Sequence, residues 1–151
     1  MTFIRRILNN GISVNKPPAL NRRIRVANLI ALLIAGIMLT YTPVFFIFEQ
    51  PVGITINSIY FFSAVTAFFL IHQHKTGVGF FLIVASSFFY FIMTSIVYGT
   101  KVNLHFFLLI VCMTTVVLFR SRKIVQPLLA LAIISFFLMI LWGHYYDRLI
   151  Y

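Results

Sequence analysis

The chain has 151 residues, of which 62% are apolar and 9% are charged, and its mean hydropathy is +1.03. A water-soluble domain of this length cannot bury so much hydrocarbon inside itself, so the composition excludes a soluble globular protein. A net charge of +10 in a soluble protein would indicate nucleic-acid binding, but here the cations flank apolar runs. They suit the anionic headgroups of a lipid bilayer, and no nucleic-acid partner is expected.

Residues 1–25 form a basic segment ahead of the first long apolar run. In the stretch FIRRILNNGI, four apolar residues fall on one helical face: Phe3, Ile4, Ile7 and Leu8. This pattern suits a short helix in the cytoplasmic membrane interface, with a disordered basic tail as the alternative. The prolines of NKPPAL break any helix there. Secretory signals have an earlier and shorter apolar stretch, so no signal peptide is expected.

Five hydrophobic spans follow, at residues 26–48, 52–71, 78–98, 104–119 and 124–145. A helix needs about 20 residues to cross a bilayer core about 30 Å thick. The fourth span has 16 residues, about 24 Å, and crosses only if Asn103 and Arg120 lie in the headgroup zones. Short alternating segments typical of membrane strands are absent from the sequence. The sequence predicts an all-α, polytopic transmembrane helical bundle with five helices in this chain.

The cations predict the orientation of this bundle. With the N-terminus in the cytoplasm, ten of the twelve Lys and Arg residues fall on the cytoplasmic side, as the positive-inside rule requires. The main topology anchors lie before the first span and between the fourth and fifth: Arg22, Arg23, Arg25, Arg120, Arg122 and Lys123. Five spans place the C-terminus outside. Residues 146–151 are therefore expected to begin a connection to a missing sixth helix, with a natural five-helix protein as the alternative.

The chain carries no enzyme site that its sequence identifies. The one cysteine, Cys112, lies inside the fourth span, where it is expected to pack as a small apolar group. The sequence has no phosphate loop, nucleophile elbow or zinc-ligand spacing. A metal held by His105, His144 and a carboxylate would lack motif spacing, so no metal and no cofactor are expected.

Polar residues inside membrane spans are costly and often functional. Those nearest the outer ends of the spans are the ligand or sensing candidates: Asn57, Tyr90, Tyr98, Asn103, His105 and His144. Turned inward, together with serines and threonines of the second and third spans, they would line a pocket that opens outward.

Each candidate also has a structural interpretation. Asn57 can bridge two helices, the tyrosines can anchor the chain at the interface, and Ser or Thr can bond to its own backbone. The two outer histidines can cap or anchor helices, whereas a sensing role would use the charge change of histidine near neutral pH. His72 and His74, beside Lys75, are expected in a solvated inner loop.

Two stretches, PPALNRRIRVANLIALLIAG and YGTKVNLHFFLLIVCMTTVVLF, resemble a bacterial six-helix membrane sensor module. This module precedes sensor histidine kinases, including the α-hydroxyketone quorum receptors, and class III adenylate cyclases. The resemblance covers residues 15–145, with Asn28, Gly99, His105, Phe106 and Phe107 as the matching positions. The chain departs from the module because it has no sixth helix and no cytoplasmic catalytic domain. The resemblance implies a receptor in the bacterial inner membrane.

The resulting hypothesis is a membrane sensor module that is not itself an enzyme. A small lipophilic ligand would favour one helix packing over another and so bias a homodimeric output domain. The resemblance implies a histidine kinase as the first choice for that output and an adenylate cyclase as the second. The alternative is a small transporter, channel or membrane accessory subunit. Against transport, the sequence has no acidic residue deep in a span and no paired Gly/Pro-interrupted helices.

Overall fold

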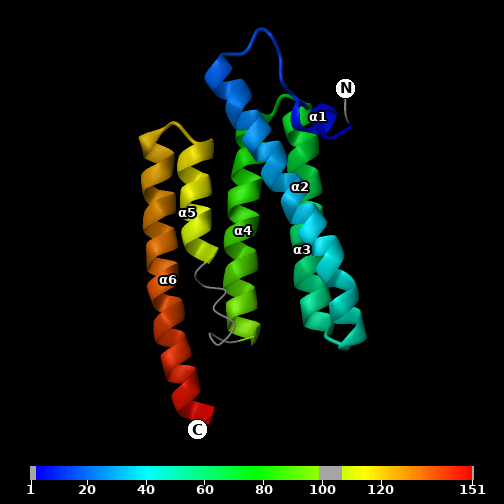
Figure 1. Cartoon of the computed structure of the whole chain (residues 1–151). Helices are drawn as coiled ribbons and strands as arrows, with labels where there is room; N and C mark the ends of the chain where they lie inside the picture. Colours follow the sequence, from blue (N-terminus) through cyan, green and yellow to red (C-terminus); the bar gives the residue numbers. More distant parts are fainter. Residues whose placement is uncertain (1–2, 99–106, 151) are drawn as a thin grey trace. The chain divides into compact units, whose positions relative to one another are not determined.

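The computed structural model describes residues 3–98 and 107–150, with the side chains of residues 4–98, 107–143 and 145. All elements in this part of the chain are α-helices, which confirms the predicted all-α class (Figure 1). The helices are α1 (Phe3–Leu8), α2 (Pro18–Ile47), α3 (Pro51–His72), α4 (Thr76–Tyr98), α5 (Phe107–Leu118) and α6 (Arg122–Ile150). They belong to two compact units, Met1–Ser86 and Ser87–Tyr151, whose boundary falls within α4.

Four helical segments are long and apolar enough to cross a membrane: Pro18–Ile47, Pro51–His72, Thr76–Tyr98 and Arg122–Gly143. They mark the chain as an integral membrane protein. The fourth predicted span, residues 104–119, corresponds to α5, which has 12 residues. That length gives about 18 Å, less than the bilayer core of about 30 Å. Residues 99–106, where this span would begin, lie outside the described part, so a fifth crossing stays a prediction.

The first unit is built on the hairpin of α2 and α3. Both helices begin with proline at the first helical position, where its missing N–H costs nothing. NKPPAL breaks the helical path only before Pro18, so α2 begins eight residues ahead of the predicted span. Small and branched side chains recur every three or four residues along the buried faces: Ala27, Ala31 and Ile34 on α2, and Ala64, Ala67 and Ile71 on α3. Small residues at these positions let two helix backbones approach closely.

The second unit contains the hairpin of α5 and α6. Leu108, Val111 and Leu118 are the buried apolar residues of α5, whereas Met113 is 72% exposed. The rings of Phe91 and Phe107 stack with centroids 5.3 Å apart. Helix α6 begins at Arg122, two residues ahead of the predicted span, and Pro127 lies inside it.

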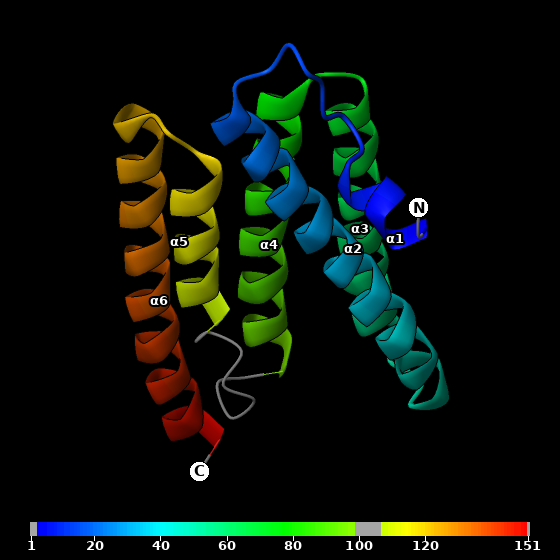
Figure 2. The same cartoon turned by 45° about the horizontal axis from the view of Figure 1, so that its top comes forward.

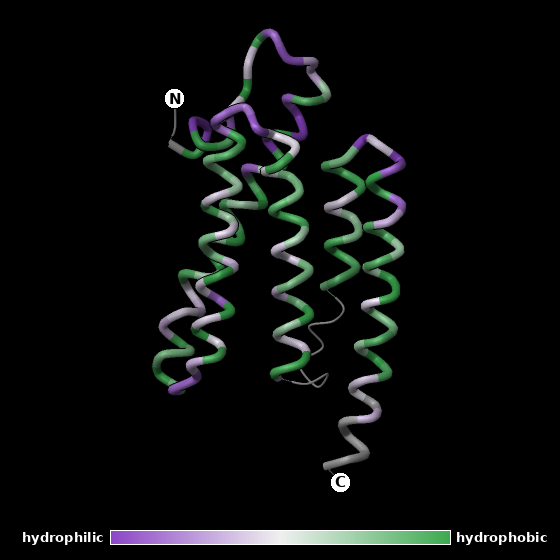
Figure 3. The backbone as a smooth tube through the Cα atoms, turned by 180° about the vertical axis from the view of Figure 1, so that it is seen from behind, coloured by the Kyte–Doolittle hydropathy of each residue, from purple (hydrophilic) through white to green (hydrophobic). Residues whose placement is uncertain are grey.

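Hydrophilic residues concentrate at the ends of the helices in each unit (Figure 3). In the first unit they occupy the segment before α2 and the turn between α3 and α4, and in the second the turn between α5 and α6. Exposed side chains along the helices are mostly apolar, as for surfaces that face lipid. The middle parts of the described helices are therefore apolar, and their ends are polar.

Candidate functional site

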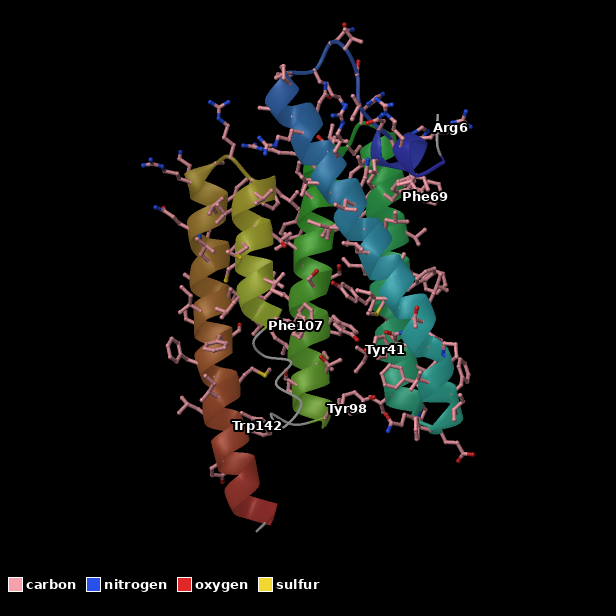
Figure 4. The ribbon with its side chains drawn as sticks, viewed as in Figure 1. Arg6, Tyr41, Phe69, Tyr98, Phe107 and Trp142 are labelled. Carbon is pink, nitrogen blue, oxygen red and sulfur yellow. The ribbon has the colours of Figure 1, made fainter. Side chains whose placement is uncertain are left out.

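The chain before α2 folds back over one end of the first unit. Helix α1 and residues 9–16 lie against the start of α2 and the end of α3 (Figure 2). Arg6 of α1 and Phe69 of α3 lie at this end (Figure 4). The predicted helical pattern in FIRRILNNGI corresponds to a helix at Phe3–Leu8, whereas its location in a membrane interface stays a prediction. We refer to residues 3–16 as the N-terminal segment.

Asn28 of α2 holds the end of α1. Its side chain is 0% exposed, and its Nδ2 lies 3.1 Å from the carbonyl oxygen of Leu8 and 2.8 Å from that of Asn10. A longer contact of 3.4 Å reaches the carbonyl oxygen of Ile7. The last carbonyls of a helix have no partner within the helix. The Asn28 amide therefore caps α1 from a neighbouring helix.

Residues 10 and 11 bring the N-terminal segment onto α3. Gly11 has a φ of +77°, and a Cβ atom at this position would lie 2.5 Å from the carbonyl oxygen of Ile71. Only glycine adopts this conformation without strain and allows so close a backbone approach. Asn10 also contacts α3: its Nδ2 lies 3.5 Å from the carbonyl oxygen of Phe68, and its Oδ1 lies 2.6 Å from His72 Nδ1.

Lys16 closes this contact region at the turn between α3 and α4. Its Nζ donates to the carbonyl oxygen of Gly11 at 2.8 Å and lies 3.1 Å from His74 Nδ1. Arg25 of α2 donates from Nε to Asn9 Oδ1 at 3.0 Å. His72 and His74 are exposed, as expected for a solvated loop, yet each is bonded to the N-terminal segment. The sequence did not indicate these bonds.

Asn57 lies between α2 and α3. Its side chain is 0% exposed, and its Nδ2 donates to the carbonyl oxygen of Met38 at 2.9 Å and to Thr42 Oγ1 at 2.5 Å. The Thr42 hydroxyl donates in turn to the Met38 carbonyl at 2.7 Å. Pro43 has no N–H to donate to the carbonyl of Leu39, so the continuous helix α2 lacks one backbone hydrogen bond here. The Asn57 amide therefore bridges α3 and α2, as in its structural interpretation.

A groove of about 610 Å³ runs along another face of α3, with Leu82 of α4 on its wall. Four hydroxyl residues line it: Thr55, Ser58, Ser63 and Thr66. Ile59 and Phe62 supply apolar surface beside them. The hydroxyls of Thr55 and Ser63 donate to carbonyls of their own helix at 2.9 and 2.8 Å, as the structural interpretation of membrane Ser and Thr predicts. Ser58, Ser63 and Thr66 are among the second-span serines and threonines that the sequence analysis grouped with the ligand candidates.

The other five ligand candidates lie either in the described part of the second unit or outside the described residues. Tyr90 and Tyr98 belong to α4 beyond the unit boundary. Asn103 and His105 lie outside the described residues, as does the side chain of His144. A hollow of about 350 Å³ in the second unit is lined by Ile96, Leu138, Met139 and Trp142, which offer no ionisable group. A single pocket that joins all six candidates stays a prediction.

The topology anchors lie at the ends of the apolar helices. Arg22, Arg23 and Arg25 are in the first two turns of α2, Arg120 is in the turn before α6, and Arg122 and Lys123 begin α6. The only carboxylate of the first unit, Glu49, lies in the turn between α2 and α3, at the far end of α2 from its arginines. Among the described residues, no cluster of three or more His, Cys, Asp or Glu residues offers a metal site.

Comparisons with known proteins found no matching family model, no similar curated protein and no similar solved structure. The resemblance to a sensor module thus has no support beyond the two stretches that carry it. Of its matching positions, Asn28 has a defined structural partner, and Phe107 stacks on Phe91. Lys16, His72 and His74 were missed as interacting residues because their partners follow from the return of the N-terminal segment, which no periodic pattern indicates.

Proposed function

We propose that this chain is the membrane-embedded module of a receptor. The observation that supports it is the groove on α3, where four hydroxyl residues lie along a helix long and apolar enough to cross a membrane. Polarity at membrane depth is costly. The hydroxyls of Thr55 and Ser63 meet this cost by bonding to their own helix, so Ser58 and Thr66 are the two that the proposal assigns to a ligand. The groove suits a small lipophilic or amphiphilic ligand, whose apolar body meets Ile59 and Phe62 while a polar group bonds to Ser58 or Thr66.

The same helix supplies a route for the response. Thr66, at one end of the groove, is followed after two residues by Phe68, whose carbonyl contacts Asn10 of the N-terminal segment. A ligand that binds one placement of α3 better than another shifts the population toward that placement. Because the end of α3 is bonded to the N-terminal segment, such a shift also changes the polar end of the first unit.

The remaining parts of the proposal concern the surroundings of the chain. The helix ends that carry the topology anchors lie on the cytoplasmic face of a bacterial inner membrane, against anionic headgroups. The output domain lies outside this chain and works as a homodimer, with a histidine kinase as the first candidate and a nucleotide cyclase as the second.

The direct test is to read the coding sequence beyond the codon for Tyr151. The proposal expects one further apolar span of about 20 residues and then a cytoplasmic kinase or cyclase domain. A stop codon after Tyr151 would remove the output and favour a transporter or an accessory subunit. Ion flux through the purified chain in lipid vesicles would independently favour transport.

The groove has its own test in the full-length protein. Replacing Ser58 and Thr66 by leucine fills the groove and removes two hydroxyls, and the proposal expects output activity to lose its response to the signal. Thr40→Leu is the matched control, because Thr40 is exposed on α2 and its hydroxyl bonds only to its own helix at the Gly36 carbonyl. Equal responses in both variants would contradict a role for the groove.

A further inference from the structure

The positive and negative charges of the first unit lie at opposite ends of the α2–α3 hairpin. Its Lys and Arg residues precede α2, begin α2 or follow α3: Arg5, Arg6, Lys16, Arg22, Arg23, Arg25 and Lys75. Glu49, the only carboxylate of this unit, lies in the turn between α2 and α3. The cations therefore have no carboxylate of their own unit beside them, which leaves them available to an external anion.

Asn9 holds one of these cations, Arg25, at the end of α1. Arg25 Nε donates to Asn9 Oδ1 at 3.0 Å. The backbone N–H of Asn9 donates to the carbonyl oxygen of Arg5 at 3.2 Å, so Asn9 lies one helical turn after Arg5. Residues one turn apart share a helix face, with Cβ atoms about 5–6 Å apart. Arg5 of α1 and Arg25 of α2 therefore flank the same amide, although they belong to different helices.

The arginines around Asn9 keep donors for a further group. The bond to Asn9 uses one of the five N–H groups of the Arg25 guanidinium and leaves the four on its Nη atoms. Arg22 lies one turn before Arg25 on α2, and the side chains of Arg5, Arg22 and Arg25 are exposed. Guanidinium groups bind phosphate oxygens through paired N–H donors. Three exposed arginines around one amide thus suit a phosphate group.

The surface of α2 that continues from Arg25 is apolar and exposed. Leu29 and Leu32 follow Arg25 by four and seven residues, which places them on the same helix face. They are 43% and 37% exposed, and the neighbouring Leu33 is 54% exposed. All three belong to a helix long and apolar enough to cross a membrane. Arginines at the helix end and exposed leucines after them match a molecule with a phosphate group and a hydrocarbon chain.

We propose that Arg5, Arg22 and Arg25 bind the phosphate of one anionic phospholipid, whose acyl chain lies along Leu29 and Leu32. A soluble phosphate compound would use the arginines and leave the leucines uncovered, so the surface favours the lipid. The site rests on the proposed contact of this helix end with headgroups, and it narrows a general attraction to one defined position. It does not depend on the receptor role, and its test measures lipid binding and not signalling.

The test places a single tryptophan beside the expected acyl chain. In a reporter chain, Trp142→Phe removes the only native tryptophan and Leu33→Trp introduces one next to the exposed leucines. The full chain is held in vesicles of phosphatidylcholine, to which brominated phosphatidylglycerol or brominated phosphatidylcholine is added. Bromine atoms quench a tryptophan that their lipid contacts. The brominated anionic lipid should occupy the position beside the tryptophan with about tenfold preference over the zwitterionic lipid.

Variants of the reporter chain separate a defined site from general surface charge. Arg25→Gln should lower the preference about fivefold. Arg22→Gln leaves the bond between Arg25 and Asn9 intact and should have a similar effect, which gives a second reading if Arg25→Gln loosens the N-terminal segment. Lys75→Gln is the matched control, because it removes the same charge from the same end of the unit but follows α3. It should change the preference by less than about twofold.

Three results would contradict the proposal. In the first, the two brominated lipids quench the reporter chain equally. In the second, Arg25→Gln and Lys75→Gln lower the preference by the same factor, which would assign it to overall charge. In the third, an excess of soluble glycerol phosphate at constant ionic strength removes the preference, which would assign the arginines to a soluble phosphate compound.

Discussion

Asn28 and Asn57 show how single polar residues are accommodated in apolar helices. Each side chain is 0% exposed, and each donates its amide hydrogens to backbone carbonyls of another segment. Within the described part, the Oδ1 atoms of both amides are buried without a hydrogen-bond partner. Their contribution therefore depends on the N–H groups alone, which makes each position sensitive to a change from donor to acceptor.

Asn28 provides a direct test of this dependence. Asn28→Ala should lower the free energy of unfolding by about 1–3 kcal/mol, because partly buried carbonyls of the N-terminal segment lose their donor. Asn28→Asp should cost more, since a carboxylate would face three carbonyl oxygens. Thermal unfolding in detergent micelles, followed by circular dichroism, measures both. Asn15→Asp at an exposed position is the control and should change stability by less than about 0.5 kcal/mol. Equal stability of the two Asn28 variants would contradict the donor role.

Gly11 has an equally specific prediction. Gly11→Ala forces a Cβ into a backbone carbonyl and a residue with a side chain into a positive φ. We expect amide hydrogen exchange in residues 9–16 to accelerate by about tenfold or more, which corresponds to strain of about 1–3 kcal/mol. Gly36→Ala is the matched control, because a Cβ there meets nothing within 4 Å. In the middle of α2 that change should stabilise the helix by about 0.5–1 kcal/mol. Unchanged exchange in Gly11→Ala would show that the segment is not packed on Ile71.

At the scale of this site, the sequence indicated some residues and not others for a physical reason. Asn57 stood out because polarity inside an apolar span is visible in the sequence alone, and helix bridging was among its interpretations. Lys16 contacts His74, which is 58 residues further along the chain, and Asn10 contacts His72, which is 62 residues further along. They depend on how the N-terminal segment returns to the hairpin, and no local pattern encodes that return.

Among the elements, the long helices were the most predictable. The predicted spans 52–71 and 78–98 agree with Pro51–His72 and Thr76–Tyr98 within two residues at each end. Long apolar runs bounded by prolines or charges leave little freedom in where a helix begins and ends. Helix α2 was underestimated at its start because RRIR is polar, although a helix can continue through charged residues when they lie beyond the bilayer core.

Helix α5 is the element whose environment is best tested directly. Its Cys112 is half-buried and is the one native thiol of the chain. If α5 lies in hydrocarbon, a charged maleimide should leave Cys112 unlabelled in intact vesicles and should label it once the chain is unfolded in denaturing detergent, because only the thiolate reacts and it needs water to form. Mass spectrometry gives the labelled fraction. As a control, Ser121→Cys in a chain with Cys112→Ala places a thiol in the exposed turn before α6 and should react quickly. Rapid labelling of Cys112 by the charged reagent would place α5 at an aqueous surface.

For the whole molecule, composition and hydropathy were sufficient to predict an all-helical membrane protein with at least four long apolar helices. They were not sufficient to establish a fifth crossing, because the 12 residues of α5 are too few to decide it. Function is less accessible still, since a helical bundle supports many activities and only its sites distinguish them. The hydroxyl residues of the groove are visible in the sequence as polar residues of an apolar span. Helical periodicity alone did not show that they line one groove together with Leu82 of α4.

Orientation is the prediction that belongs to the molecule as a whole. Fusions of a fluorescent protein that matures only in the cytoplasm should fluoresce when joined before residue 1 or after Lys75, and stay dark when joined after Glu49. Replacing Arg22, Arg23 and Arg25 by glutamine should reduce this bias, because each cation near the membrane surface is worth about 1 kcal/mol. Fluorescence from the fusion after Glu49 in the native chain would reverse the predicted topology.

The contacts between Lys16 and His74 also constrain how the protein is made. Synthesis proceeds from the N-terminus, and the histidine is added 58 residues after the lysine. At about 5–20 residues per second, the lysine waits about 3 to 12 s for its partner. Until then the N-terminal segment can bind only to α2 or to components outside the nascent chain. The contacts of the N-terminal segment with α3 and the following turn therefore form only after the second long helix has emerged.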